Sequence, residues 1–300
     1  MRKEERLILT LDFFQIDTIS ECETKWDLSY NQCLRLPFAD TSKMDMGTLV
    51  HSLLARYYTR RAINPSQNYL MDAHWAFEDF IASHEIQNFG FDLNEVGGFL
   101  RKRFGEYAIN YPPSVDFLPI VNKGEPAVEV GFSKILFQDK LRVYIIEGRI
   151  DLLSRISNKY AWFPIFWDHK SQDKAAYFYK FTPQFKTYAL ATGYRYCGVN
   201  YFGLQQDSKN ENVFRRQIFQ MPEHLITEWK AYVINKFHRV YNFRKYGVPL
   251  DKNRGACPGT YDTHPCFFTS ICDERKEKQD LVKWFNYIKV EPWQPWKHEK

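Results

Sequence analysis

The chain has 300 residues, 44% of them hydrophobic, and a formal net charge of +5 at pH 7. This composition can bury a sizeable core and excludes an intrinsically disordered protein, and no stretch approaches the roughly 20 apolar residues of a membrane helix. The apolar run at 7–11 is too short for a secretory signal, so we expect a cytoplasmic protein, in the host cytoplasm if it is viral. The mildly basic charge permits nucleic-acid binding without requiring it.

Helices are expected between Met44 and about residue 111. Apolar side chains between Met44 and Arg60 recur at spacings of three and four, which is typical of an amphipathic helix. The segments 72–84 and 94–111 can continue this helical region, and the two prolines at 112–113 would end it.

Strands follow the helices. Three segments rich in Val, Ile, Phe, Tyr and Trp are separated by short polar turns, which predicts an antiparallel meander at 127–137, 141–156 and 160–170. A helix from Pro183 to about Tyr194 comes next, since proline suits the first turn of a helix. Two more strands, 198–205 and 213–220, precede a long helix that begins at Pro222. This order predicts the α/β class, with a mixed sheet.

Two aspartates and a lysine lie on neighbouring strands of the meander. Asp151 ends the motif Gly-Arg-Ile-Asp, and Asp168 and Lys170 form the motif Asp-x-Lys on the next strand. Residues i and i+2 share a face of a strand, and a hairpin can bring Asp151 next to Asp168. Crowded carboxylates repel each other unless a cation lies between them, and oxygen ligands suit Mg²⁺ or Mn²⁺. The neighbouring ammonium can orient a water molecule for attack on a phosphate.

Asp-x-Lys alone is a weak signal, because about one such match is expected by chance in a chain of this length. Other motifs in the chain strengthen it. His51 ends the motif Gly-Thr-x-x-His on the first helix and can be a third metal ligand, although a lone helical histidine is more often structural. Gln184 and Tyr188 lie four residues apart on one helical face, where they can order the lysine or bind a phosphate, or can be ordinary surface.

The order of these motifs along the chain resembles the RecB-like branch of the PD-(D/E)XK nuclease superfamily. The resemblance implies a restriction-endonuclease-like core, in which helices flank a central mixed sheet. It also implies a metal-dependent DNA nuclease, an exonuclease that hydrolyses single-stranded DNA or DNA ends. The site residues it implies are the Mg²⁺ or Mn²⁺ ligands His51, Asp151 and Asp168, the catalytic Lys170, and the supporting Gln184 and Tyr188.

A further acid can belong to this site. Glu129 lies on the strand before Asp151 and matches an acid often found there in this family, although a strand glutamate can simply face solvent. Glu147 is a possible substitute, because it shares a strand face with Arg149 and Asp151.

Four cysteines resemble those of an iron–sulfur subset of this family, which includes small nucleases of phages and of CRISPR adaptation. Cys22 lies near the N-terminus, and Cys257, Cys266 and Cys272 lie near the C-terminus. The resemblance implies a 4Fe–4S cluster that staples both chain ends into one lobe, although the gap from Cys257 to Cys266 is longer than usual. Four thiolates can equally hold Zn²⁺, with His264 as an alternative ligand, and some can be buried free thiols.

The chain is expected to form a single nuclease domain over residues 1–300. Its core would extend from about 41 to 220, and the cysteine lobe would combine 14–40 with 221–275. No repeat or low-complexity tract divides the sequence.

DNA is the expected partner. The basic residues between Lys236 and Arg254 can contact it or can form a solvated helix face, and the aromatic run at 176–181 can stack bases or form a hydrophobic corner. The sequence has no Walker-type phosphate loop, so a helicase or recombination partner would be a separate protein. Two alternatives stay open: a non-catalytic nucleic-acid-binding protein with a cysteine-ligated structural metal, and a recombination- or CRISPR-type end processor that works only in a complex.

Overall fold

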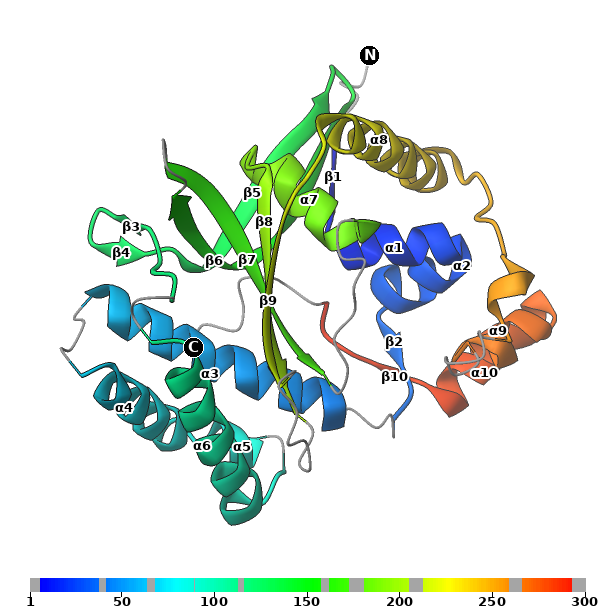
Figure 1. Cartoon of the computed structure of the whole chain (residues 1–300). Coiled ribbons are helices and arrows are strands. Elements are labelled where there is room, and N and C mark those ends of the chain that lie inside the picture. The colour runs from blue at the N-terminus through cyan, green and yellow to red at the C-terminus, as the bar shows by residue number, and fades with distance from the viewer. Residues whose placement is uncertain are drawn as a thin grey trace. The chain divides into compact units, whose positions relative to one another are not determined.

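The structure is a computed structural model of the chain (Figure 1). It describes residues 6–37, 42–63, 68–88, 90–112, 116–157, 162–172, 181–204, 213–258 and 266–292. The helices are α1 (Phe13–Glu21), α2 (Glu23–Trp26), a π-helical turn (Asp27–Asn31), α3 (Ser42–Ile63), α4 (Tyr69–Ala82), α5 (Glu85–Asn88), α6 (Leu93–Asn110), α7 (Pro183–Thr192), α8 (Glu223–Tyr246), a 3₁₀ turn (Arg254–Ala256), α9 (Thr269–Asp273) and α10 (Lys276–Asn286). The strands are β1 (Leu7–Leu11), β2 (Leu34–Arg35), β3 (Val121–Asn122), β4 (Glu125–Pro126), β5 (Val128–Gln138), β6 (Arg142–Ser157), β7 (Trp162–Gln172), β8 (Tyr196–Gly203), β9 (Phe214–Gln220) and β10 (Ile288–Lys289).

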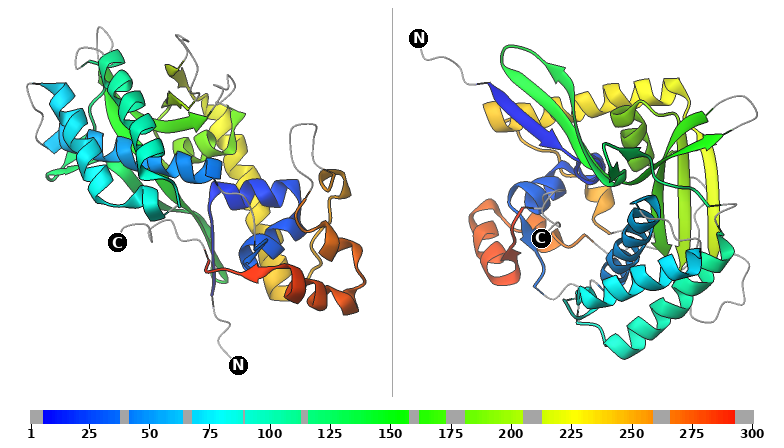
Figure 2. Two further views of the ribbon diagram at one scale, coloured as in Figure 1. Left: turned by 90° about the horizontal axis from the view of Figure 1, so that it is seen from below. Right: turned by 90° about the vertical axis from the view of Figure 1, so that its left-hand side faces the viewer.

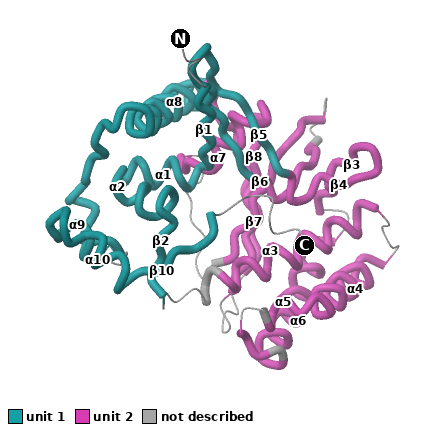
Figure 3. Tube along the Cα trace, turned by 180° about the vertical axis from the view of Figure 1, so that it is seen from behind, with its two compact units in different colours: residues 1–40, 131–148, 224–300 teal, residues 41–130, 149–223 magenta. Residues whose placement is uncertain are grey.

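The chain divides into two compact units, each assembled from separate stretches of sequence (Figure 3). Unit 1 comprises residues 1–40, 131–148 and 224–300, and unit 2 comprises residues 41–130 and 149–223. The predicted division into a core and a cysteine lobe remains a prediction.

The main sheet is mixed and has six strands. Its order is β1-β6-β7-β8-β9, and β5 also pairs with β6. β1 runs parallel to β6 and β7 parallel to β8, whereas the pairs β6–β7 and β8–β9 are antiparallel. The strand β8 is apolar along nearly its whole length, as expected of a strand with both faces covered, and all but its first residue are buried. The predicted α/β class, with helices flanking a central mixed sheet, is confirmed.

Helix α3 contributes much of the core of unit 2. Leu49, Leu53 and Tyr57 recur every four residues and are completely buried, as the spacing predicts. They share one core cluster with Phe80 of α4 and Trp167 of β7, and Figure 2 shows α3, α4 and α6 side by side. Burial of each large apolar side chain contributes about 1.5–3 kcal/mol, so this core holds α3 firmly in place within unit 2.

Unit 1 has its own small core, formed by segments distant in sequence. Leu28 and Leu34 pack with Phe268, Ile271 and Tyr287. Strand β10 pairs antiparallel with β2. These contacts bring residues around 30 beside residues around 270–290 within the unit. No helix in the described part of the chain is long and apolar enough to cross a membrane.

Candidate metal centre

Four elements of unit 2 position the side chains that the sequence singles out. β6 carries Asp151 and β7 carries Asp168, and their antiparallel register pairs Leu152 with Trp167, which places the two aspartates side by side as expected. Helix α3 supplies His51, and α7 supplies Gln184 and Tyr188. Thr182 caps α7, Pro183 occupies its first turn and Gly193 ends it with a left-handed φ of 75°, so its bounds agree closely with the prediction.

His51, Glu129 and Asp151 form the tightest group of potential metal ligands. One ligand atom from each lies within 4.8 Å of the others, and no other trio of His, Cys, Asp or Glu meets this condition among the residues that the structure describes. The Nδ1 of His51 lies 3.4 Å from the Oδ2 of Asp151. Two carboxylates and an imidazole form a donor set that suits Mn²⁺ or Mg²⁺.

Asp168 instead belongs to a hydrogen-bonded chain that ends on α7. Its Oδ2 lies 2.6 Å from the Nζ of Lys170, and its Oδ1 accepts a short hydrogen bond from the Gln184 side chain. Lys170 also donates to the Oε1 of Gln184 at 2.7 Å, and the Gln184 amide donates to the Tyr188 hydroxyl at 2.9 Å. Gln184 therefore fixes the position of the lysine and the aspartate together.

The three carboxylates of this region each have a basic partner. The pairs are Glu129–Arg149 at 2.7 Å, Asp151–His51 at 3.4 Å and Asp168–Lys170 at 2.6 Å. The pairing balances three negative charges in a site whose carboxylates are largely buried. A divalent cation that enters the site must compete with these basic groups.

Burial and mutual repulsion shift the pKa values of the site. Burial, with the Asp151 charge added, raises the pKa of Glu129 to about 7 and that of Asp168 to about 6. Burial also acts to raise the pKa of Asp151, but His51 and His169 outweigh it and hold that pKa below its usual range. Burial lowers the pKa of His51, but the neighbouring carboxylates outweigh it and raise the value to about 9.

Glu129 has an unusual backbone. Its φ is +51°, in the left-handed region that residues other than glycine seldom occupy. This conformation costs roughly 1 kcal/mol for a residue with a Cβ. Residues held in such conformations cluster at functional sites, and here the conformation accompanies a carboxylate that joins the ligand trio. In the sequence Glu129 is only a further candidate, because a strand glutamate can simply face solvent, and no sequence pattern indicates its φ.

Two motif glycines allow close packing around the site. A Cβ at Gly47 would lie 3.1 Å from the Oγ of Ser171, so glycine lets α3 approach β7. A Cβ at Gly148 would lie 2.8 Å from the ring of Phe132 on β5. These contacts give a physical reason for glycine at the start of Gly-Thr-x-x-His and Gly-Arg-Ile-Asp.

A buried polar network that the sequence did not predict lies behind β7. The ring of His169 stacks on Tyr58, with 5.8 Å between centroids, and the Asn200 amide lies 3.0 Å from its Nδ1. The Asn200 amide also donates to the Tyr107 hydroxyl at 2.8 Å. Arg216 donates to four of the surrounding groups, which are Asn200, Tyr58, Tyr107 and Asp116. The members lie far apart in sequence, so only the fold brings them together.

The remaining predicted site residues lie elsewhere. Glu147 belongs to unit 1, where its carboxylate neighbours Asp12, and it is absent from the ligand trio. His264 and residues 176–180 fall outside the described part of the chain. The basic residue Arg239 forms a two-point ion pair with Glu23, at 2.8 and 2.6 Å, and also contacts Asp251 at 3.2 Å. Both acidic partners of Arg239 belong to unit 1.

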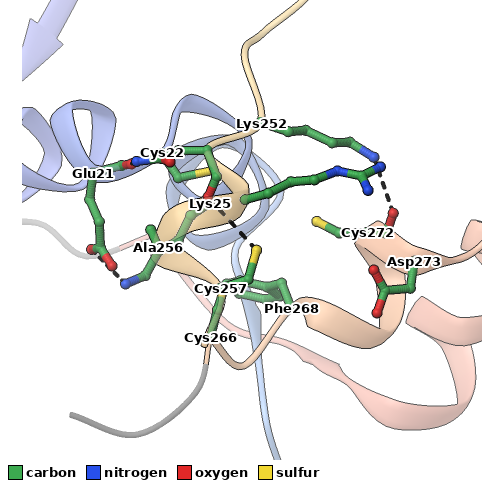
Figure 4. Close-up of a pocket in the computed structure, with 12 residues that line it drawn as sticks. Glu21, Cys22, Lys25, Lys252, Ala256, Cys257, Cys266, Phe268, Cys272 and Asp273 are labelled. Atoms are coloured by element: carbon green, nitrogen blue, oxygen red, sulfur yellow. Dashed lines mark hydrogen bonds and ion pairs between the residues drawn. The ribbon is translucent and has the colours of Figure 1, made fainter. Parts of the chain in front are cut away.

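A cavity in unit 1 is lined by all four of the cysteines that the sequence grouped. They are Cys22, Cys257, Cys266 and Cys272 (Figure 4). The cavity encloses about 470 Å³ of empty space, part of it open to solvent. Burial raises the pKa of Cys272, and the three other thiols raise it further, while Lys252 opposes them.

Comparison with known proteins identifies one family. A family model described as the PD-(D/E)XK nuclease superfamily matches residues 13–273, whereas no curated protein matches the chain. Similar solved structures include SSO0001, at 16% identity over 37% of this chain and 49% of its own length, with a TM-score of 0.26. An alkaline exonuclease from Laribacter hongkongensis aligns at 14% identity over 66% of this chain and 94% of its own, with a TM-score of 0.29. The complex of this exonuclease with dAMP aligns at 14% identity over 67% of this chain and 97% of its own, with a TM-score of 0.27.

Proposed function

Because the chain belongs to the PD-(D/E)XK nuclease superfamily, we propose that it is a Mg²⁺- or Mn²⁺-dependent deoxyribonuclease that hydrolyses phosphodiester bonds. The observation that carries the proposal is the convergence of His51, Glu129 and Asp151 beside the Lys170–Asp168 pair. Buried carboxylates with raised pKa values beside a lysine are typical of catalytic sites, which favours a nuclease over a protein that only binds nucleic acid.

The residues present fit a divalent cation. Both oxygens of Glu129 and the Oδ2 of Asp168 are buried and accept no well-aligned hydrogen bond from the described residues, although a basic group approaches each carboxylate. His51, Glu129 and Asp151 would hold the ion, with Asp168 adjacent. Such an ion supplies charge neutralisation at the phosphate and acidifies a bound water.

Lys170 has the second role in the proposed mechanism. Its ammonium is held between Asp168 and Gln184, where it can orient the attacking water and stabilise charge that develops on the phosphate. Tyr188 supports Gln184 from the next turn of α7. Gln184 thus acts through Lys170 and Asp168 as a positioning residue.

We further propose single-stranded DNA or DNA ends as the substrate and exonucleolytic action in the cytoplasm, or in the host cytoplasm if the protein is from a phage. These finer assignments rest on the RecB-like order of the motifs from His51 to Tyr188. Any helicase or recombination partner would be a separate protein.

The nuclease proposal is tested with end-labelled single- and double-stranded DNA, linear and circular, with Mg²⁺ or Mn²⁺. We expect linear DNA to be degraded by the wild type, and Lys170→Ala to abolish degradation while DNA binding is retained. Cleavage of circular DNA, which has no ends, would contradict exonucleolytic action but not the nuclease proposal. No cleavage in any combination would leave the non-catalytic alternative, or an end processor that needs its complex.

We also propose that the four cysteines lining the cavity of unit 1 hold a 4Fe–4S cluster. Tetrahedral zinc with bonds of about 2.3 Å needs sulfur atoms roughly 3.8 Å apart, yet no three cysteine sulfurs come within 4.8 Å of one another among the described residues. A 4Fe–4S cluster is larger than a single ion and takes its four cysteine ligands farther apart. The core contacts that join both ends of unit 1 would place Cys22 near the three late cysteines.

Protein purified without air tests the cysteine site. We expect a brown protein with about four iron and four sulfide per chain, and loss of both in Cys266→Ser. Cys33→Ser, outside the cavity, is the matched control and should keep the iron. A colourless protein with one zinc per chain would overturn the cluster.

A further inference from the structure

We propose that Arg149 is a phosphate-binding residue for the DNA substrate, and that Glu129 holds it until a divalent cation takes the Glu129 carboxylate. Metal loading would then release the guanidinium and strengthen DNA binding. The inference rests on the proposed nuclease function and assigns a role to a residue that the mechanism above leaves unused.

The contact between Arg149 and Glu129 is short but poorly aligned. Its Nε lies 2.7 Å from the Oε2 of Glu129, yet neither oxygen of Glu129 accepts a well-aligned hydrogen bond from the described residues. Arginine has five donors in a planar fork, and its strong carboxylate pairs are aligned and often bidentate. The Arg149–Glu129 contact is therefore a single-point ion pair, which lacks the second aligned bond of a strong arginine–carboxylate pair.

The competitor for Glu129 would be the metal ion itself. Glu129 shares the ligand trio with His51 and Asp151. A divalent cation carries twice the charge of a guanidinium and prefers carboxylate oxygens. Arginine has no acceptor atom, so it cannot join the ion as a ligand and must find another anion when Glu129 is taken.

Arg149 lies where a DNA phosphate would come. It is two residues before Asp151 on β6, and residues at this spacing share a strand face. Its side chain is 33% exposed, whereas that of Asp151 is 9% exposed. The released guanidinium would thus sit on the metal-binding face of the strand, at its solvent side, and its fork matches two phosphate oxygens.

Fluorescence anisotropy with a labelled single-stranded oligonucleotide tests the exchange. The full chain carries Lys170→Ala to prevent cleavage, and DNA affinity is compared in EDTA and in Mn²⁺. In this parent we expect Mn²⁺ to tighten binding about tenfold, the usual effect of one charge-assisted contact. Arg149→Gln should lose most of this gain and keep only the part that the ion's own charge supplies. In EDTA it should match the parent within about twofold, since Arg149 is already paired with Glu129 there.

Two further variants sharpen the test. Arg155, six residues along β6 and exposed, lies on the same face, so Arg155→Gln should keep the gain from Mn²⁺. Arg149→Lys should restore part of it, because it keeps the charge without the fork. Two results would overturn the proposal. One is that Mn²⁺ tightens DNA binding by Arg149→Gln as much as by the parent. The other is that Arg149→Gln weakens DNA binding equally in EDTA and in Mn²⁺.

Mn²⁺ binding without DNA, followed by electron paramagnetic resonance, separates this role from a structural one. Arg149→Gln should bind Mn²⁺ at least as tightly as the parent, because a competing cation has been removed. Weaker Mn²⁺ binding would show that Arg149 only positions Glu129, and would also overturn the proposal. Absence of both Mn²⁺ binding and cleavage in the wild type would overturn the nuclease function itself, which distinguishes the two failures.

Discussion

The backbone N–H of His169 donates a 2.6 Å hydrogen bond to the Oδ2 of Asp151. His169 stands between Asp168 and Lys170, so the strand that carries Asp-x-Lys also orients the carboxylate of the other motif. The His169 ring is held from behind by Tyr58 and Asn200. The proposed metal ligand Asp151 is therefore supported by a backbone whose position depends on the buried network.

Gln184 offers a test of how Lys170 is positioned. We expect Gln184→Ala to lower kcat by about 10²-fold, because misplacing a catalytic group by about 1 Å costs this much, while DNA affinity changes little. Tyr188→Phe removes only the hydroxyl that accepts from Gln184, so its effect should be smaller. Single-turnover cleavage and anisotropy measure the two quantities. Equal effects on kcat from both variants would contradict a positioning role for Gln184.

Metal binding should strengthen as pH rises. The pKa of His51 is raised to about 9, and His51 must lose its proton to become a ligand. Glu129 and Asp168, with pKa values of about 7 and 6, lose theirs earlier. Mn²⁺ affinity should therefore rise from pH 6 to 9, by up to about tenfold per pH unit for each proton released.

His51→Gln is the control for this pH dependence. The variant keeps both carboxylates of the trio, so its Mn²⁺ affinity should still rise through pH 6 to 7 and then level off. Calorimetric titrations with Mn²⁺ at several pH values measure both proteins. A wild type whose affinity is constant from pH 7.5 to 9 would contradict the role of His51.

Local rules account for the part of the site that the sequence predicts. Asp151, Asp168 and Lys170 follow from two neighbouring strands with a short turn, where period two and a hairpin register fix the geometry. The spacing of Gln184 and Tyr188 predicts one shared face of α7, which Pro183 and Gly193 bound, but only the family resemblance assigned the pair to the site. Only the family resemblance could assign His51 to the site, because α3 and β7 are about 120 residues apart in the sequence and no local pattern predicts their contact.

Long-range contacts and backbone strain account for what the sequence does not predict. Strand β1 pairs with β6 across more than 130 residues, and its five-residue run has no periodicity that distinguishes it. The part played by Glu129 depends on a φ of +51°. The network of Arg216, Asp116 and Asn200 depends on the order of β7, β8 and β9, which no local pattern encodes.

Asp116 should be a critical residue for the stability of unit 2. Its side chain is fully buried and lies 2.7 Å from Arg216 and 3.1 Å from Arg61. Asp116→Asn keeps the shape but leaves two largely buried guanidinium groups without their counter-ion, which should cost about 3–5 kcal/mol of unfolding free energy. Urea denaturation measures it. Glu85→Gln, which removes the half-exposed partner of Arg56, should cost less than about 1 kcal/mol, and a similar loss in both variants would contradict the special role of Asp116.

Arg239 should keep the segment around Cys22 close to the segment around Asp251, whether or not the cysteines bind a metal. It ties Glu23, which follows Cys22, to Asp251, whose N–H also donates to Glu23 at 2.9 Å. Arg239→Met would leave the mostly buried Glu23 carboxylate without its counter-ion, at a cost of about 2 kcal/mol, and iron of the proposed cluster should leave faster when a chelator is added. Arg244→Met, which loses a contact to the neutral Asn31, is the control.

The same comparison in a Cys266→Ser background decides whether the contacts of Arg239 with Glu23 and Asp251 depend on the proposed cluster. If Arg239 braces the chain by itself, Arg239→Met should lower the urea midpoint as much in the background as in the wild type. A loss seen only in the iron-loaded protein would mean that the cluster brings Glu23 and Asp251 together, and that the ion pair merely follows. Equal losses would mean that Cys22 is placed at the cavity before any iron binds.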